Sequence, residues 1–394
     1  MSPRIVILGG GVIGSAIAYF VCRDPAFRGE VMVIERDPTY REASSALSVN
    51  SIRQQFSTAV NIEISRFAIG FLREAHARLA VDGKSPTLDL VEPGYLFLAT
   101  HAGVDVLERN HALQRTLGAD IALLETPSLR ARFPWLSVHD IAAGALGLSG
   151  EGWLDGYGLL QAFRSKALSL GARYINAEAI CFSTSGRRVT SVALADGSEI
   201  GCDMAVNAAG PWAAAVARWI GVDLPVRARK RSVFVFTCPT PLEPRDAVPL
   251  VVDPSGVWFR PEGHDRFLGG VSPDAGEDPD DLPLEPDLEL FEEIVWPTLA
   301  ARVPAFEALR RTRAWAGYYD FNTLDQNAIL GLHPEWENVF FANGFSGHGM
   351  QQSPAVGRGI AELVLHGGYR TLDLTPLGFE RVIADRPFVE MNVI

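Results

Sequence analysis

The chain has 394 residues, a formal net charge of −12 and a pI near 5.2, and 47% of its residues are hydrophobic and 21% charged. This composition excludes an intrinsically disordered chain and a nucleic-acid-binding surface, and the length allows one large or two intertwined domains. The four cysteines lack C-x-x-C spacing, so we expect no disulfide framework, no metal site and a reducing compartment.

The start of the chain does not follow the pattern of a signal peptide. Elsewhere no apolar run reaches the ~18–20 residues, free of charge and glycine, that a transmembrane helix needs. We therefore expect no membrane span and a cytoplasmic protein, and peripheral attachment to the inner membrane stays open.

A glycine turn close to the N-terminus dominates the pattern. Residues 4–8 are almost entirely apolar and predict a buried parallel strand, which runs into a G-x-G-x-x-G motif and then a helix. Such a turn lets a pyrophosphate approach the backbone at the helix N-terminus. The alternative is a plain strand–helix–strand unit with a glycine turn. The predicted cofactor contacts here are Gly9, Gly11, Val12, Ile13 and Gly14.

A second apolar strand, residues 31–34, ends at Glu35. An acidic residue at this place can accept hydrogen bonds from the ribose hydroxyls of an adenosine, although this stretch does not decide between NAD and FAD. Ser44, Ser45 and Ser48 follow in a loop, where hydroxyl groups could donate to phosphate or ribityl oxygens. The alternative for these serines is a helix N-cap cluster.

The middle of the chain mixes helical and strand periods. The predicted elements are a helix over 62–79, a strand over 91–99, a helix over 101–118, strand and turns over 134–152, a helix over 157–170 and short strands over 172–205.

Residues 204–213 form a strand that ends in small residues, with a helix expected after Pro211. Small residues at the carboxyl end of a strand allow a cofactor to approach closely, and simple helix–strand packing is the alternative. From 224 to 313 strands predominate, with a helix at 286–301. This stretch predicts an inserted antiparallel sheet that forms the substrate side of a cleft.

The C-terminal part contains a second glycine turn, with Gly344, Gly347 and Gly349 between a strand and a helix. Pro354 suits the first turn of that helix, which we expect to run to about residue 365. A helix N-terminus aimed at a flavin pyrimidine ring would stabilise the anion that forms on reduction.

The ordered set of motifs resembles the FAD-dependent amino-acid and amine oxidoreductases typified by D-amino acid oxidase, glycine oxidase and monomeric sarcosine oxidase. The matching segments are residues 9–14, 35–36, 44–45, 152–155, 207–212 and 344–349. The resemblance implies an α/β fold in which a Rossmann-type, glutathione reductase-like FAD-binding domain is interleaved with a mainly antiparallel β-sheet substrate domain. The implied FAD-binding domain comprises residues 1–85, 151–223 and 315–394, and the substrate domain comprises residues 86–150 and 224–314.

The resemblance also implies roles for individual residues. Glu35 would hold the ribose, Ser44 and Ser45 the pyrophosphate, Ala179 the adenine through its backbone, and the turn 344–351 would lie along the flavin. The implied cofactor-binding residues are Gly9, Gly11, Val12, Ile13, Gly14, Glu35, Arg36, Ser44, Ser45, Ser48, Ala179, Ala209, Gly210, Trp212, Gly344, Phe345, Ser346, Gly347, His348, Gly349, Met350 and Gln351.

Some positions match one branch of the family and others depart from it. Arg53 stands where sarcosine oxidase-like enzymes hold the substrate carboxylate, and a surface arginine is the alternative. Tyr318 and Tyr319 stand where glycine and D-amino acid oxidases have an arginine, which makes deamination of primary amino acids less favoured. Gln351 replaces a lysine of the sarcosine oxidases.

Two further departures concern the flavin. The lysine that promotes oxygen reduction aligns loosely with Phe267, and no cysteine follows Cys238 to tether the cofactor. The resemblance therefore implies non-covalent FAD, with oxygen or a quinone-type electron carrier as the acceptor.

From these residues we expect oxidation of the C–N bond of a secondary or N-substituted amino acid, with transfer of a hydride to flavin N5 and hydrolysis of the imine. The expected catalytic residues are Arg53, Tyr318, Tyr319, His348 and Gln351, with His348 either a positional residue or a general base. The alternatives are an FAD-dependent 2-hydroxy acid dehydrogenase and a non-catalytic, flavin-bearing assembly factor.

Overall fold

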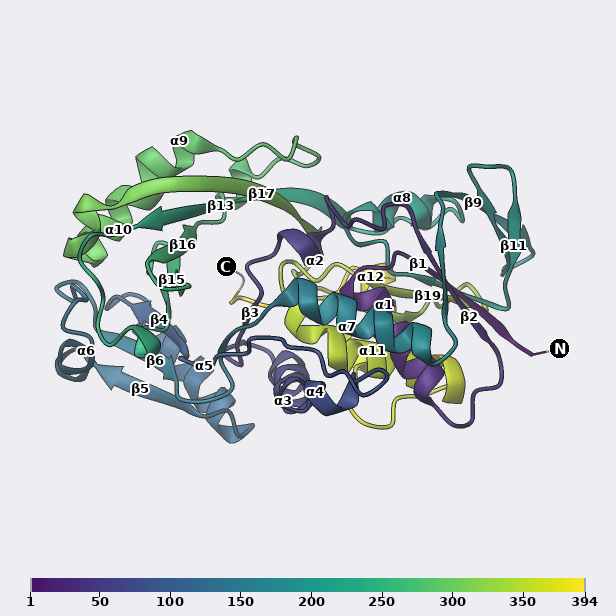
Figure 1. Ribbon diagram of the computed structural model, residues 1–394, viewed down its shortest axis with the longest axis horizontal. Helices are drawn as coiled ribbons and strands as arrows, with labels where there is room; N and C mark the ends of the chain where they lie inside the picture. The colour runs from purple at the N-terminus through teal and green to yellow at the C-terminus, as the bar shows by residue number, and fades with distance from the viewer. Residues whose placement is uncertain (1, 393–394) are drawn as a thin grey trace.

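Two large β-sheets organise the computed structural model, which describes residues 2–392. Figure 1 shows them at opposite ends of an elongated molecule. In strand order, the six-stranded sheet contains β18 (Ile329–Leu332), β19 (Val339–Asn343), β12 (Met204–Asn207), β1 (Arg4–Leu8), β2 (Glu30–Glu35) and β8 (Arg173–Asn176). All neighbours in it are parallel except β18 and β19.

Both faces of this parallel sheet are covered, as its apolar strands require. Ile5 and Ile7 of β1 pack in one core with helices α1 (Val12–Arg23), α3 (Ala59–Arg73), α7 (Gly156–Ser169) and α11 (Gly349–His366). Val6 and Leu8 point the other way, into a core with α8 (Ala213–Arg218) and a three-stranded sheet. That sheet consists of β9 (Ala179–Ser185), β10 (Arg188–Leu194) and β11 (Glu199–Gly201).

The second large sheet has eight strands and is antiparallel except between β14 and β4. In order they are β17 (Arg310–Asn322), β13 (Val226–Thr237), β16 (Arg266–Gly270), β15 (Trp258–Glu262), β14 (Leu250–Val252), β4 (Tyr95–Ala99), β6 (Ala143–Gly147) and β5 (Ile121–Glu125). This arrangement agrees with an α/β fold that carries a largely antiparallel second sheet.

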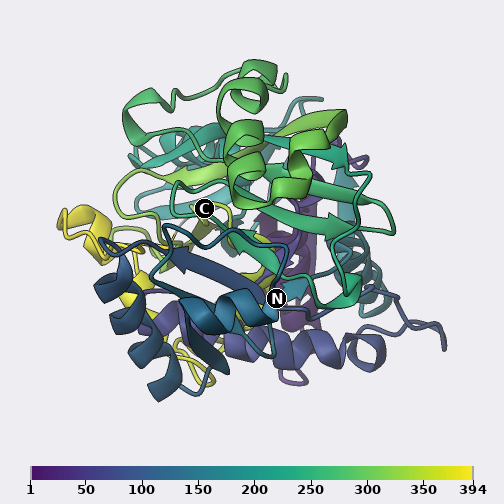
Figure 2. The same cartoon turned by 90° about the vertical axis from the view of Figure 1, so that its left-hand side faces the viewer.

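Helical segments cover the eight-stranded sheet. The green segments in Figures 1 and 2 are α9 (Leu288–Leu290), the π-helical turn η4 (Phe291–Val295) and α10 (Trp296–Arg302). The blue segments below them include α5 (Val104–Thr116) and α6 (Thr126–Arg132). Between the sheet and α9–α10 lies a core of phenylalanines: Phe234, Phe236, Phe259, Phe267, Phe291 and Phe306.

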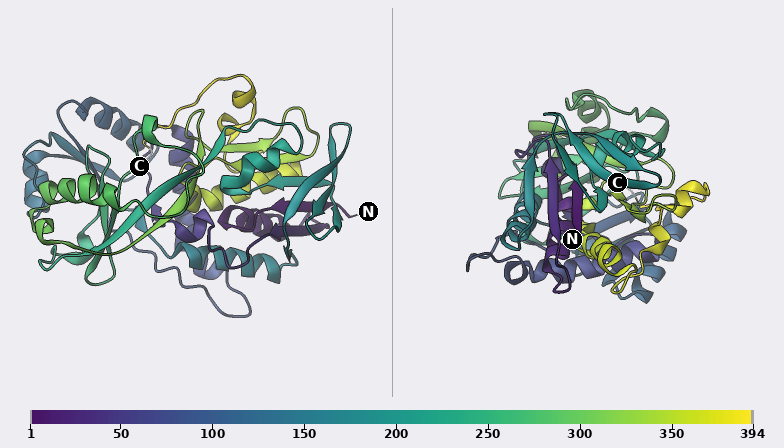
Figure 3. Two further views of the ribbon diagram at one scale, coloured as in Figure 1. Left: turned by 90° about the horizontal axis from the view of Figure 1, so that it is seen from above. Right: turned by 90° about the vertical axis from the view of Figure 1, so that its right-hand side faces the viewer.

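Short elements connect the layers. They are α2 (Ser44–Leu47), β3 (Ser51–Ile52), α4 (Ala75–Arg78), β7 (Gly152–Trp153), η1 (Gly210–Trp212), η2 (Arg245–Ala247), η3 (Ala275–Glu277), η5 (Pro304–Ala308), η6 (Thr375–Leu377) and α12 (Glu380–Ile383). Figure 3 shows that the N-terminal strand–helix–strand unit lies at the end of the molecule away from the eight-stranded sheet.

One strand pair links the two ends. β13 and β17 pair antiparallel from Val226 and Asn322 at one end to Thr237 and Arg310 at the other. The domain boundary expected at residue 315 therefore falls inside a paired strand, and the division into two domains stays a proposal.

Three expected elements need correction. The strand expected over 91–99 begins only at Tyr95, because Pro93 has no N–H to donate and Val91 makes a single bridge to Trp153. The helix expected over 286–301 is three consecutive segments, and its wider π-helical turn precedes Pro297, which lacks the N–H that would continue the α-helical ladder.

The third correction concerns Pro354, which does not start the C-terminal helix. α11 begins at Gly349, so the proline lies inside it. Proline cannot donate the backbone hydrogen bond that an α-helix expects at this position, to the carbonyl of Met350. The Ser353 hydroxyl donates to that oxygen instead, at 2.9 Å, which explains how the helix tolerates the proline.

Candidate active site

A cavity of about 690 Å³, a volume typical of ligand sites, lies where the two large sheets approach each other. Its walls come from the carboxyl ends of β1 and β2, the α2 region, the turn before α11, and strands β13 and β17. In an open parallel sheet this edge is the usual place for a bound nucleotide.

Two glycines of the first turn, Gly9 and Gly14, leave no room for a side chain. A Cβ on Gly9, whose φ is +98°, would lie 2.3 Å from the carbonyl oxygen of Ala208. A Cβ on Gly14 would lie 1.9 Å from the Gly9 carbonyl oxygen, so α1 can pack against the turn only through glycine. At Gly11 the nearest atom is the Ser45 hydroxyl, at 3.3 Å. The backbone at Gly9 and Gly11 lines the cavity directly.

The carboxylate of Glu35 fixes the loop at the end of β2. One of its oxygens accepts from the Gly10 N–H at 2.8 Å and the other from the Asp37 N–H at 2.9 Å. Beside it the Arg36 guanidinium lies 3.9 Å from the ring centre of Trp212. Together these side chains give the cavity an end with a carboxylate and a flat stacked surface, which fits an adenosine.

Hydroxyl groups face the N-terminus of α1. The Ser45 hydroxyl accepts from the Val12 N–H at 3.1 Å and keeps its own proton for another partner. Within the described part of the chain, the buried Ser44 hydroxyl has no hydrogen-bond partner. A pyrophosphate would supply the missing acceptors. None of these serines caps α2, because Ala43 is its N-cap and no side chain caps it.

The second glycine turn packs against β17. A Cβ on Gly347, whose φ is +94°, would lie 2.5 Å from the ring of Tyr319, so the turn and the ring can meet only through glycine. Asp320 holds the turn, because its Oδ2 accepts from the N–H groups of Gly344 at 2.9 Å and Phe345 at 3.2 Å. Burial raises the pKa of Asp320 to about 7, against the lowering effect of the Phe345 and Gly344 N–H groups.

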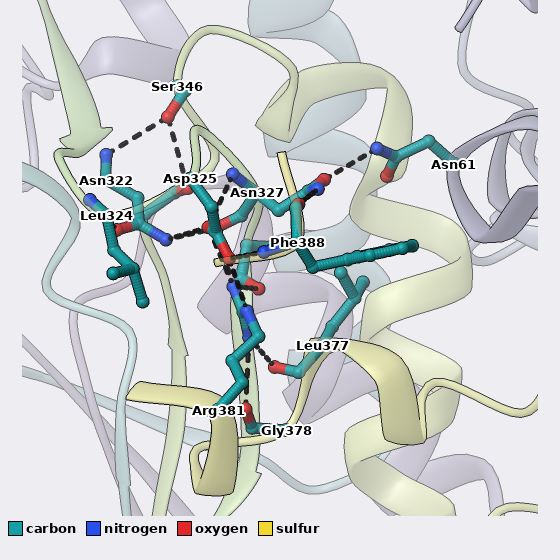
Figure 4. A network of polar contacts seen from close by, with 12 residues as sticks. Asn61, Asn322, Leu324, Asp325, Asn327, Ser346, Leu377, Gly378, Arg381 and Phe388 are labelled. Atoms are coloured by element: carbon teal, nitrogen blue, oxygen red, sulfur yellow. Dashed lines mark hydrogen bonds and ion pairs between the residues drawn. The ribbon is translucent and has the colours of Figure 1, made fainter. Parts of the chain in front are cut away.

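A buried polar network supports this turn from below, as Figure 4 shows. The Ser346 hydroxyl accepts from the Asn322 N–H at 3.0 Å, and the Asn322 amide donates to Asp325 at 2.7 Å. The Arg381 guanidinium in turn donates to Asp325 at 2.6 Å. In addition to Asp320, the turn is therefore fixed by charged and amide groups that lie outside the cavity lining.

Arg53 is buried, at 3% exposure, and lines the cavity. Its guanidinium lies 4.2 Å from the Phe56 ring centre and donates to the carbonyl oxygens of Gln55, at 2.6 Å, and Asn392. Burial lowers its pKa from the ordinary arginine value. Over residues 2–392, none of its hydrogen-bond partners is a carboxylate. The buried carboxylates of Glu151 and Glu390 stabilise its charge from a distance, without a hydrogen bond to it. A buried cation with no carboxylate bonded directly to it attracts an anion.

His348 contacts the same guanidinium, with its Nε2 2.9 Å from Nη2 of Arg53. A guanidinium can only donate, so Nε2 must accept and the imidazole proton is on Nδ1. Burial and then the charge of Arg53 lower the pKa of His348 well below its ordinary value, so the ring is neutral. This geometry favours a positional role over a general base. Gln351 also serves Arg53, since its Oε1 accepts from the Arg53 N–H at 2.7 Å.

The end of the cavity beyond Tyr318 and Tyr319 contains residues that the sequence patterns did not single out. They are Tyr95, Arg231, Ser232, Val233, Leu250, Trp258, Val271, Ser272 and Asp320. Arg231 donates twice to Asp278, both at 2.8 Å, so its charge is compensated, and its guanidinium lies 5.0 Å from the Tyr319 ring centre. The apolar alternation of β13 breaks at Lys230 and Arg231, so the sequence carried no signal for this buried arginine.

Most of the predicted site residues line the same cavity. They are Gly9, Gly11, Val12, Ile13, Glu35, Arg36, Ser44, Ser45, Ser48, Arg53, Ala179, Ala209, Gly210, Trp212, Tyr318, Tyr319, Phe345, Gly347, His348, Gly349, Met350 and Gln351. Gly14, Gly344 and Ser346 lie outside the lining and shape the two turns instead. The contacts of all these residues with a cofactor stay predictions.

The position expected for Phe267 is wrong. Its ring is buried on the far side of β16, in the phenylalanine core, and does not line the cavity. Among the lining residues of the described chain no lysine occurs. Over the same residues, 2–392, no cluster of three or more His, Cys, Asp or Glu side chains could hold a metal ion, and no helix is long and apolar enough to cross a bilayer.

Comparison with known proteins places this geometry among flavoproteins. The family model described as DAO, FAD dependent oxidoreductase, matches residues 4–363. The FAD-dependent oxidoreductase domain-containing protein 1 of Xenopus laevis is 42% identical over 99% of this chain and 84% of its own length. Glycine oxidase from Geobacillus kaustophilus is 27% identical over 96% of this chain and 97% of its own length.

Among solved structures, the L-proline dehydrogenase of P. horikoshii superposes with a TM-score of 0.85 at 25% identity. The match covers 97% of this chain and 98% of that one. The similarity therefore extends over both large sheets and over the cavity between them.

Proposed function

The chain belongs to the family of FAD-dependent oxidoreductases that includes glycine oxidase and sarcosine dehydrogenase, and from this premise we propose that it oxidises the C–N bond of a secondary or N-substituted amino acid. FAD is its cofactor, and when bound it supplies the hydride acceptor. The residues of this chain then have to bind the substrate and orient it toward the cofactor.

The observation that carries the proposal is the buried guanidinium of Arg53. It lines the cavity, it is held by carbonyl oxygens and by a neutral imidazole, and over residues 2–392 it has no carboxylate partner. A substrate carboxylate would supply the directly bonded negative charge that this guanidinium lacks, through charge-assisted hydrogen bonds.

The cavity also suggests which part of the substrate lies opposite the carboxylate. Val233, Leu250 and Trp258 form apolar walls, and the charge of Arg231 is already balanced by Asp278. We therefore expect a monocarboxylate whose N-substituent or ring is apolar. β17 contributes Tyr318 and Tyr319 to this region, in keeping with a secondary rather than a primary amine.

The cofactor would be held without a covalent bond. Glu35 would accept from the ribose hydroxyls, and the hydroxyls of Ser44 and Ser45, with the N-terminus of α1, would bind the pyrophosphate. No cysteine lies among the described lining residues. Because the lining also lacks a lysine, an electron carrier such as a quinone is favoured over oxygen as acceptor.

Proton transfer needs little from the protein in this proposal. The Nε2 lone pair of His348 accepts from Arg53, so it is not free to take a proton. The amine would therefore enter uncharged, and His348, Gln351 and the tyrosines would hold the guanidinium and the substrate in place.

The test is anaerobic bleaching of the bound flavin by proline, sarcosine, other N-alkyl amino acids and 2-hydroxy acids. We expect bleaching by secondary amino acids, and Arg53→Ala should raise KM about 10- to 100-fold, the cost of losing a charge-assisted pair. Arg109→Ala, at an exposed position of α5, is the matched control and should leave KM unchanged.

Bleaching by hydroxy acids alone would instead indicate a 2-hydroxy acid dehydrogenase. A flavin that no substrate reduces would favour a non-catalytic assembly factor. An unchanged KM in Arg53→Ala would remove this arginine from the site.

A further inference from the structure

We propose that the C-terminal segment 388–392 belongs to the substrate-binding machinery, with Glu390 as the positioning residue that holds the Asn392 carbonyl group against the guanidinium of Arg53. The proposal rests on the function proposed above, because it concerns the same carboxylate-binding group. It adds a part of the chain that no motif indicated.

Glu390 anchors the segment. Its side chain is fully buried, and Oε1 accepts from the N–H and the hydroxyl of Ser57 at 2.7 and 2.6 Å. Oε2 accepts from the Thr58 hydroxyl at 2.7 Å and the Asn61 amide at 3.0 Å. Thr58 is the N-cap of α3, so this carboxylate from the far end of the chain occupies the positive end of a 15-residue helix.

A second anchor lies two residues earlier, at Phe388. Its N–H donates to Asp325 at 2.9 Å, and the Asn327 amide donates to its carbonyl oxygen. Figure 4 shows Phe388 beside the Asp325–Arg381 pair, with Asn327 reaching toward Asn61 of α3. The network that supports the second glycine turn therefore also fixes the start of this segment.

Beyond Glu390 the segment reaches Arg53. Nη2 of Arg53 donates to the Asn392 carbonyl oxygen, and the Asn392 amide donates to the Gln55 carbonyl oxygen at 3.1 Å. That same Gln55 oxygen accepts from Nη1 of Arg53 at 2.6 Å. Neither Glu390 nor Asn392 lines the cavity, so the segment holds the guanidinium from behind.

Phe388 packs against a hydrophobic core at the start of the segment, but hydrophobic burial does not explain the course of the residues that follow it. Val389 is 48% exposed and Met391 is 69% exposed, whereas Glu390 between them is 0% exposed. The segment is held by polar contacts that end at Arg53. An arginine side chain loses rotamer entropy when it is fixed, so fixing it before the substrate arrives favours binding.

The test uses the FAD-bound protein and a probe that needs no turnover. Benzoate, a simple carboxylate, is titrated while the absorption spectrum of the flavin is recorded, in wild type, Glu390→Gln and Arg53→Ala. We expect Glu390→Gln to raise the Kd of benzoate about tenfold and the KM of a secondary amino acid similarly, with kcat and the Kd of FAD little changed.

Two further variants separate positioning from folding. Removal of residues 391–394 takes away the Asn392 carbonyl but keeps the Glu390 anchor, so it should weaken benzoate binding while the melting temperature stays near that of wild type. Asp385→Asn, at an exposed position of the same C-terminal region, is the control and should change neither.

The possible results discriminate between the two proposals. Arg53→Ala weakening benzoate binding while Glu390→Gln and the truncation leave it unchanged would overturn the role of the segment alone. An unchanged benzoate Kd in Arg53→Ala would overturn the carboxylate site and the segment's role with it. Equal losses of FAD and benzoate binding in the truncated protein would show a general structural role and overturn the positioning proposal.

Discussion

Asp320 shows how one buried carboxylate can fix a turn that lines the cavity. A single oxygen of it accepts two N–H groups of the glycine turn, and burial raises its pKa to about 7. The unfolded chain releases this proton near pH 4, so between about pH 4 and 7 the folded state binds more protons than the unfolded state. The stability that the protonated group contributes therefore falls as the pH rises and is lost above about pH 7.

We predict that Asp320→Asn removes this dependence, because asparagine keeps an acceptor oxygen and has no proton to release. The difference in unfolding free energy, variant minus wild type, should increase by about 1.4 kcal/mol per pH unit between pH 5 and 7 and then level off. Urea unfolding in excess FAD, repeated from pH 5 to 8.5, measures it. A difference that does not vary with pH would contradict the ionisation assigned to Asp320.

At this scale, sequence alone could predict the residues whose neighbours in the chain reveal them. Gly9, Glu35 and Arg53 each follow a recognisable strand or loop signal, and all three line the cavity. Arg231 and Asp320 could not be predicted, because their inward position depends on pairing between strands that are distant in sequence. Phe267 was misplaced for the same reason, since the face of β16 that meets the cavity is set by its neighbours.

At the scale of an element, helix α11 accommodates a proline in its interior. Pro354 removes one backbone donor inside the helix, and the Ser353 hydroxyl bonds the Met350 carbonyl instead. We predict that Ser353→Ala lowers the unfolding free energy by about 1–3 kcal/mol, the cost of leaving a buried carbonyl unpaired.

The double variant Ser353→Ala/Pro354→Ala should recover most of this loss, because an alanine in place of the proline has an N–H that can donate to the same oxygen. Pro354→Ala alone is the reference that completes the thermodynamic cycle. Urea unfolding of the four proteins measures the coupling. Purely additive effects would show that the hydroxyl and the missing N–H do not serve the same carbonyl.

Element types were predictable where the period of the apolar residues is clear, as for β1, α1 and α3. The first and last residues of the elements were less predictable. The course of α11 and the π-helical turn both depend on residues that replace or interrupt backbone hydrogen bonds. The order of the eight-stranded sheet was beyond prediction, since β4 and β14 are neighbours although about 150 residues separate them.

At the scale of the whole molecule, the cavity is formed by both large sheets, so FAD should stabilise the fold as a unit. Excess FAD at 100 times its Kd should add about 2.7 kcal/mol to the unfolding free energy, measured as a melting temperature that rises with FAD concentration. A melting temperature that does not change with FAD concentration would contradict this prediction.

A matched pair of glycine variants tests the packing of the first glycine turn. Gly14→Ala places a Cβ 1.9 Å from the Gly9 carbonyl oxygen, so it should cost about 1–3 kcal/mol and weaken FAD binding. Gly70→Ala meets nothing within 4 Å inside α3 and should stabilise the protein by about 0.5–1 kcal/mol. Similar effects from the two changes would contradict the tight contact assigned to Gly14.

The six-stranded sheet draws its centre from widely spaced parts of the chain, with β1, β12 and β19 adjacent although their residues run from 4 to 343. On the ribosome, more than three hundred residues must therefore emerge before β19 can cover the open edge of β12, which takes roughly 20–70 s at ordinary rates of synthesis. The cavity is consequently completed late, because its lining includes Phe345 and residues 347–351, which follow β19 in the chain. Until β19 pairs, the edge of β12 presents unpaired N–H and C=O groups to which a strand of another chain could add.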